Sequence, residues 1–118
     1  RLCSSAASDV YKRQIQHPLA ESWCELEAAW LVTMQAAWLY DNGRDCGAQA
    51  NAAKYLAGEA GFRACERAVM SHGGMGYAKE FQVERLLREV LICRIAPVTP
   101  HLILSHIAER VLDLPKSY

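Results

Sequence analysis

The chain has 118 residues, which is enough for one domain at most. Its 13 lysines and arginines balance 13 aspartates and glutamates, so the formal net charge is zero and no nucleic-acid partner is expected. Hydrophobic residues make up 52% of the sequence, too many for a disordered chain. No apolar run approaches the roughly 18 residues of a membrane-spanning helix, so we predict a soluble globular domain without a membrane span.

No CxxC pair occurs among the five cysteines, which are Cys3, Cys24, Cys46, Cys65 and Cys93. The four histidines also lack the spacing of a zinc site. We therefore predict free thiols and no bound metal. Because residues 1–14 contain no apolar stretch typical of a secretory signal, the expected location is the cytoplasm, in a bacterial cell.

Residues 1–14 (RLCSSAASDVYKRQ) have no clear hydrophobic periodicity and are rich in serine and alanine. They resemble translated sequencing-adapter text of the kind found at the ends of metagenomic reading frames. We predict a non-native or disordered leader here and place the domain at residues 15–118.

The first predicted helix starts at Pro18, because a proline fits the first helical turn, where its missing N–H is not needed. Asn42 and Gly43 supply the stop signal. Apolar residues recur between them at steps of three or four, as on one face of a helix: Leu19, Trp23, Leu26, Trp30, Met34, Ala37 and Trp38. Core packing is the commonest role of such a stripe, so the three tryptophans are predicted to lie in the core.

Three further helices follow. The second is predicted from about Ala48 to Ser71, where large residues fall seven apart among many alanines. Helical spacing resumes from Val83 to Leu91. Thr99 suits an N-cap and Pro100 a first turn, opening a last helix through about Leu112. Because no segment alternates like a strand, the expected fold is all-α, with antiparallel helices joined by short loops.

A glycine-rich segment, His72-Gly73-Gly74-Met75-Gly76-Tyr77, separates the second and third helices. It follows a helix and not a strand, so the usual dinucleotide-binding context is absent. Two interpretations stay open. The glycines could end the helix, or they could form a ligand-facing loop whose bare backbone a phosphate approaches closely.

Several motifs, in a fixed order, carry a family resemblance. They are Gln16-His17-Pro18-Leu19-Ala20, Ala53-Lys54, the glycine segment 72–77, Val83-Glu84-Arg85 with Arg88-Glu89, and Ile107-Ala108-Glu109-Arg110. Together they make residues 16–118 similar to the C-terminal domain of acyl-CoA dehydrogenases. The resemblance implies an up-and-down four-helix-bundle type of domain, incomplete here because the first helix of the family's domain is missing. The apolar stripe that this helix would cover should lie exposed.

The resemblance also implies contacts with FAD. In such enzymes the glycine motif touches the FAD of a neighbouring subunit, so Gly73 and Gly74 are expected cofactor contacts. Met70 occupies the position of a flavin-contacting glutamine in many members. Thr99 is retained in the loop before the last helix, and His101 holds a position that is often polar. We predict cofactor contacts at all five residues.

The same loop usually carries the glutamate that removes the substrate's α-proton, and Pro97 stands at that position. Because proline cannot accept a proton, no catalytic residue is predicted in this chain. Two explanations remain. Some members place the base on the preceding helix, upstream of Gln16; alternatively, the parent is a non-catalytic helical subunit or interaction module of the same family.

The resemblance finally implies the activity and partners of the whole enzyme. Acyl-CoA dehydrogenases oxidise an acyl-CoA thioester to the 2,3-enoyl-CoA, with α-proton removal and β-hydride transfer to FAD. They form homotetramers, as dimers of dimers, and pass electrons to an electron-transferring flavoprotein. We expect the parent protein to share these properties and this chain alone to be inactive.

Overall fold

The computed structural model describes the backbone of residues 2–117 and the side chains of residues 10 and 12–117. Its elements, in chain order, are α1 (Leu2–Asp41), α2 (Gly47–Ser71), the short 3-10 helices η1 (Gly73–Tyr77) and η2 (Lys79–Phe81), α3 (Val83–Val90), α4 (Ile92–Ile95) and α5 (Pro100–Arg110). Over these residues there is no strand, and the all-α prediction is confirmed.

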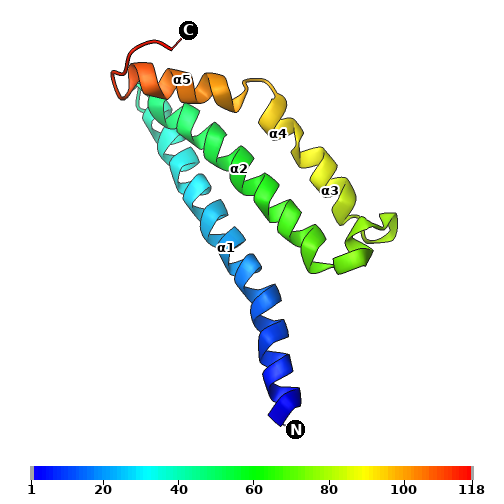
Figure 1. Ribbon diagram of the computed structural model, residues 1–118. Coiled ribbons are helices and arrows are strands. Elements are labelled where there is room, and N and C mark those ends of the chain that lie inside the picture. Colours follow the sequence, from blue (N-terminus) through cyan, green and yellow to red (C-terminus); the bar gives the residue numbers. More distant parts are fainter. Residues whose placement is uncertain (1, 118) are drawn as a thin grey trace.

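The helices lie around α2, which contacts every other α-helix. Helices α1 and α2 form an antiparallel hairpin, and α3 and α4 return along α2 in the opposite direction (Figure 1). Helix α5 crosses the end of the hairpin that carries the α1–α2 turn (Figure 1). The glycine-rich corner therefore lies at the other end of α2.

Helix α1 begins at Leu2, so the prediction that it starts at Pro18 is wrong. Pro18 lies inside the helix, where it removes one backbone hydrogen bond without ending the element. Residues 2–17 contain neither glycine nor proline, so nothing in their sequence stops the helix before Pro18. The assignment of residues 1–14 to a non-native or disordered leader stays a prediction.

The other helix boundaries follow local signals. Helix α2 starts beside Asp45, whose Oδ1 accepts a hydrogen bond from the Gly47 amide at 3.0 Å. At α5 the predicted cap is confirmed, since Thr99 Oγ1 accepts from the Leu102 amide at 3.4 Å and Pro100 occupies the first turn. The helix ends at Arg110, slightly before the predicted end.

The core between the helices is made of small side chains. Its buried residues are Ser22, Ala29, Leu39, Ala53, Ala60 and Ile103. The prediction of a tryptophan core is wrong: Trp23, Trp30 and Trp38 are 65%, 57% and 55% exposed. They lie on the side of α1 that faces away from α2, whereas the buried residues of α1 face it. The expected exposed apolar stripe is therefore present.

The molecule is elongated, with principal extents of 60 × 30 × 29 Å. Its radius of gyration is 18.6 Å, against about 13.5 Å for a compact domain of this length. Its accessible surface is 8759 Å², against about 6,400 Å² for a compact monomer of this size. The chain leaves uncovered much surface that a self-contained domain would bury.

One stretch, Val83–Arg110, is long and apolar enough by composition to cross a membrane. The sequence analysis did not detect it, because charged residues interrupt every apolar run. In the structure this stretch is divided among α3, α4 and α5, and residues 96–99 are not helical. The absence of a membrane span stays a prediction.

Candidate functional site

The glycine-rich corner turns the chain from α2 into α3. Gly73 has a φ of +59°, a conformation that glycine adopts without steric cost, and it ends α2 directly after His72. Gly76 is buried, and a Cβ there would stand 2.2 Å from the Val69 carbonyl oxygen. A Cβ at Gly74 would meet nothing within 4 Å. Two glycines thus shape the corner, while Gly74 leaves bare backbone open to a ligand.

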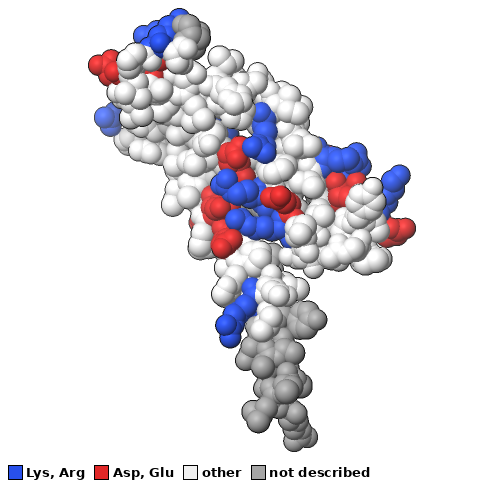
Figure 2. Space-filling view, viewed as in Figure 1, with Lys and Arg blue, Asp and Glu red and all other residues white. Residues whose placement is uncertain are grey.

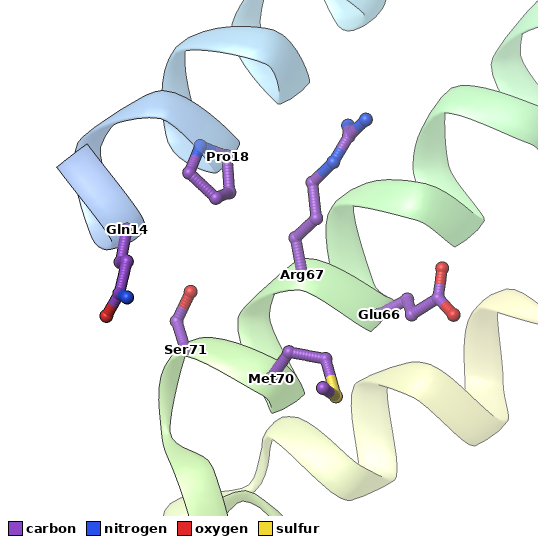
Figure 3. A pocket seen from close by; sticks show the side chains of 6 residues that line it. All are labelled: Gln14, Pro18, Glu66, Arg67, Met70 and Ser71. Atoms are coloured by element: carbon purple, nitrogen blue, oxygen red, sulfur yellow. The ribbon is translucent and has the colours of Figure 1, made fainter.

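Met70 lies beside this corner and lines a pocket of about 270 Å³ between the end of α2 and α1, together with Gln14, Pro18, Glu66, Arg67 and Ser71 (Figure 3). The Arg67 side chain extends toward α1, whereas Met70 and Glu66 point toward the α3 side (Figure 3). Met70 is 74% exposed. An apolar side chain this exposed is available for contact with a partner or a ligand.

The loop before α5 holds the other predicted site residues. Its Ala96–Pro97 peptide bond is cis, and Thr99 is extended and caps α5. His101 is exposed in the first turn of the helix. The Pro97 side chain supplies neither a proton acceptor nor a donor, so this position offers no general base.

The structure does not bring the two groups of predicted residues together. Asn51 shares a pocket with Val98 and Leu102, beside the loop before α5. Met70 follows 19 positions later on α2, which corresponds to a rise of about 28 Å along the helix. Met70, Gly73 and Gly74 therefore lie at one end of α2, and Thr99 and His101 at the other.

A network of ion pairs, which the sequence analysis missed, connects three helices between these two ends. Arg67 of α2 pairs with Glu25 at 2.8 Å and with Glu21 at 3.2 Å, both on α1. Arg63 pairs with Glu25 at 3.1 Å and with Glu59 at 3.7 Å. Alternating charges gather over the middle of the face seen in Figure 2.

The network extends to α4, where Arg94 pairs with Glu59 at 2.9 Å and lies 4.5 Å from the centroid of the Phe62 ring. A signal for it was present in the sequence. Glu21 and Glu25 are four apart, and so are Glu59, Arg63 and Arg67, so each set lies along one helical face. Nothing local showed that the two sets would meet.

Hydrogen bonding within the network shifts the acidity of its members. The hydrogen bond from Arg67, aided by Arg63, lowers the pKa of Glu25 against the opposing effect of burial. The same hydrogen bond to Glu25 raises the pKa of Arg67. Both side chains are therefore held in their charged forms, which suits a structural role better than proton transfer.

The remaining candidates are the cysteines and groups of side chains that could bind a metal. Cys24, Cys46, Cys65 and Cys93 are free thiols, and Cys3 lies outside the described side chains. Burial raises the pKa of the Cys65 thiol, with a smaller effect from Cys93. Within the described part of the chain, no three histidine, cysteine, aspartate or glutamate side chains are grouped to hold a metal ion. The absence of a metal stays a prediction.

Comparison with known proteins adds to this geometry. The family model described as acyl-CoA dehydrogenase, C-terminal domain, matches residues 10–112. An acyl-CoA dehydrogenase of Mycobacterium tuberculosis is 45% identical over 106 residues, which cover 88% of this chain and 27% of that protein. A subunit of the caffeyl-CoA reductase-Etf complex of Acetobacterium woodii is 42% identical over 77 residues, 65% of this chain and 20% of that protein.

A third relative is the short/branched chain specific acyl-CoA dehydrogenase, mitochondrial, of Rattus norvegicus, 35% identical over 97 residues, 82% of this chain and 22% of that protein. The chain spans about a quarter of the length of the relatives it matches. The match covers α2 to α5 and most of α1, including both groups of predicted site residues. The chain therefore belongs to the acyl-CoA dehydrogenase family and corresponds to its C-terminal domain.

Proposed function

We propose that the protein to which this chain belongs is an FAD-dependent acyl-CoA dehydrogenase, which oxidises an acyl-CoA thioester to the 2,3-enoyl-CoA. The observation that carries the proposal is the family match across residues 10–112, which includes the glycine motif and the loop before α5. When bound, FAD would accept the hydride from the β-carbon while a base removes the α-proton. This chain would supply cofactor contacts and oligomer interface.

The residues at the glycine corner fit a role in holding the cofactor. Gly73 and Gly74 have open space where a Cβ would stand, so a ligand can approach their backbone closely. Met70 presents an exposed apolar side chain beside them, suited to van der Waals contact in place of the hydrogen bonds of a glutamine. At the other end of α2, Thr99 at the N-cap of α5 and His101 in its first turn would face a cofactor.

The separation of the two groups supports an oligomeric enzyme. Groups at opposite ends of a rise of about 28 Å along α2 are better placed to touch two cofactors than one. We propose that the glycine corner contacts the FAD of a neighbouring subunit in a dimer of dimers, while the loop before α5 faces another cofactor. The large exposed surface of the chain is consistent with such an assembly.

The catalytic base is proposed to lie on the helix that precedes this domain segment, because Pro97 cannot serve. What supports this is that the glycine motif and Thr99 persist although the glutamate position does not. The alternative is a non-catalytic helical subunit of the same family, which the loss of the glutamate position favours.

The proposed electron acceptor is an electron-transferring flavoprotein. The name of the Acetobacterium woodii relative, a subunit of an Etf complex, supports this choice. The proposed location is the cytoplasm of a bacterial cell.

Flavin reduction in the full-length protein tests the proposal. The purified protein should be yellow, and its absorbance near 450 nm, roughly the flavin maximum, should fall when an acyl-CoA is added without oxygen. A colourless protein from which no flavin is recovered would refute the flavoenzyme. A yellow protein that no acyl-CoA bleaches, across short, long and branched chains, would favour the non-catalytic alternative.

A further inference from the structure

One face of α2 packs against the segment that leads into the loop before α5, residues 96–99. Asn51, Lys54 and Gly58 lie along that face at helical spacing. Lys54 and Gly58 lie against Cys93 of α4, and Asn51 shares a pocket with Val98 of the loop that follows. Figure 1 shows α4 beside α2, with the following loop leading to α5. Residues far apart in sequence thus meet directly before the loop at residues 96–99.

Lys54 satisfies a carbonyl that the loop itself leaves without a partner. In an α-helix the Cys93 carbonyl would accept a hydrogen bond from the residue four positions later, which is Pro97. Proline has no N–H to donate. The Lys54 ammonium donates to the Cys93 oxygen instead. The end of α4 at Ile95 and the missing N–H of Pro97 thus leave the Cys93 carbonyl as the acceptor that Lys54 fills.

Close packing fixes the position of that carbonyl relative to α2. A Cβ on Gly58 would stand 3.1 Å from the Cys93 oxygen, so the backbone of α4 rests on α2 with little space to spare. The next residue, Arg94, is fixed by its pair with Glu59 at 2.9 Å and by its contact with Phe62. Both residues before the loop are thus tied to α2 by side chains.

The far end of the loop is tied as well. Thr99 caps α5 through the Leu102 amide, and Ile103 is 2% exposed against the rest of the chain. Only residues 95–98 lie between the two anchored ends. A short segment fixed at both ends moves when either anchor moves.

We propose that Lys54 is a positioning residue for the loop at residues 96–99, which sets where Thr99 and the backbone around Pro97 face the reacting substrate. The proposal rests on the proposed dehydrogenase function for its consequence in catalysis. Its structural part, the control of the loop by Lys54, does not depend on that function. The structural part and the effect on catalysis are therefore tested by two separate measurements.

Amide hydrogen exchange on the 118-residue chain tests the structural part. In Lys54→Met, exchange at Ala96, Leu102 and Ile103 should accelerate on the order of tenfold, the effect of losing one charge-assisted hydrogen bond. Lys54→Arg, which can still donate to the Cys93 oxygen, should restore slow exchange. Lys79→Met is the matched control, since that lysine is exposed on η2. Unchanged exchange across residues 92–103 in Lys54→Met would overturn the proposal.

Steady-state kinetics of the full-length flavoenzyme test the consequence. Lys54→Met should lower kcat about tenfold with little change in KM, because a displaced loop misaligns the reacting groups more than it weakens binding. Lys54→Arg should recover most of kcat, and Lys79→Met should match the wild type. Equal losses in Lys54→Met and Lys54→Arg, or an unchanged kcat in Lys54→Met, would overturn the positioning role. A wild-type protein without flavin would instead refute the dehydrogenase function and leave the exchange result to decide on Lys54.

Discussion

The two sides of α1 face very different surroundings. The side toward α2 carries Glu21, Glu25 and Ser22, which meet Arg63 and Arg67 across the hairpin. The opposite side carries Trp23, Trp30 and Trp38, each more than half exposed. Charged groups thus lie between the helices, and the largest apolar side chains lie outside.

This arrangement differs from that of an ordinary surface helix, whose apolar stripe faces its own core. The inner side is closed by small residues and hydrogen-bonded charges, which let the helices approach closely. The outer side has the wide apolar stripe that normally marks a buried surface. We expect the helix that precedes this segment in the parent protein to cover it, as the family resemblance implies.

The tightest glycine contact is at the glycine-rich corner, where Gly76 lies against the end of α2, and one added methyl group should have the largest effect there. Gly76→Ala places a Cβ against the Val69 carbonyl oxygen. It should lower the free energy of unfolding by about 3 kcal/mol, because backbone on both sides must move. Urea denaturation of the chain would measure it. Gly74→Ala is the control and should change little; equal losses in both variants would show that the corner tolerates no side chain anywhere.

Removal of the central arginine tests the charged side of the comparison. Arg67→Met leaves Glu25 half-buried with only Arg63 to pair with. The expected loss is about 1 to 2 kcal/mol, between the values for exposed and buried pairs. Arg88→Met removes an exposed pair with Glu84 within α3 and should leave the unfolding midpoint unchanged. A stability equal to wild type in Arg67→Met would show that the network is not what joins α1 to α2.

The pH dependence of stability provides a second test of the charged side of α1, which faces α2. Because the pKa of Glu25 is lower in the folded chain than its ordinary value, the folded state gains stability above the unfolded pKa of about 4.3. That gain is full above about pH 5 and is lost as the pH falls toward the lower folded pKa. Between pH 6 and pH 3 the thermal unfolding midpoint of the wild type should fall more steeply than that of Glu25→Gln, which has no carboxylate at this position to protonate. Parallel curves for the two proteins would contradict this assignment.

The outer side should give the smallest effect on the chain itself. Trp30→Ala removes a side chain that is already exposed, so the free energy of unfolding should change by less than about 0.5 kcal/mol. Leu39→Ala, on the buried side, should cost about 2 kcal/mol or more. Light scattering should show weaker self-association in Trp30→Ala, since an exposed apolar patch favours it. A large loss of stability in Trp30→Ala would reverse the comparison.

Local signals predicted most of the helix boundaries. Thr99 and Pro100 gave the start of α5, and the Asn42-Gly43 pair gave the end of α1 within a residue. Each depends on a few neighbouring positions. The start of α1 was mispredicted because Pro18 suits a first helical turn, whereas in the structure it lies inside α1 and the helix continues through it.

Features that depend on distant residues could not be predicted from spacing. Glu25 and Arg67 form a contact although they are 42 positions apart in the sequence. The periodicity of α1 predicted an apolar stripe but did not indicate what covers it. The link from Lys54 to the Cys93 carbonyl spans 39 positions and involves a backbone atom. The candidate cofactor contacts came only from the family resemblance, since no spacing rule identifies them, and they remain predictions.

The long first helix has a practical consequence for experiments in solution. A particle of 60 × 30 × 29 Å tumbles and diffuses more slowly than a sphere of equal mass. It should therefore elute early from a gel-filtration column, where a single copy could pass for a pair. Mass measured by sedimentation equilibrium does not depend on shape, and it is the quantity that should be used to count subunits of this protein.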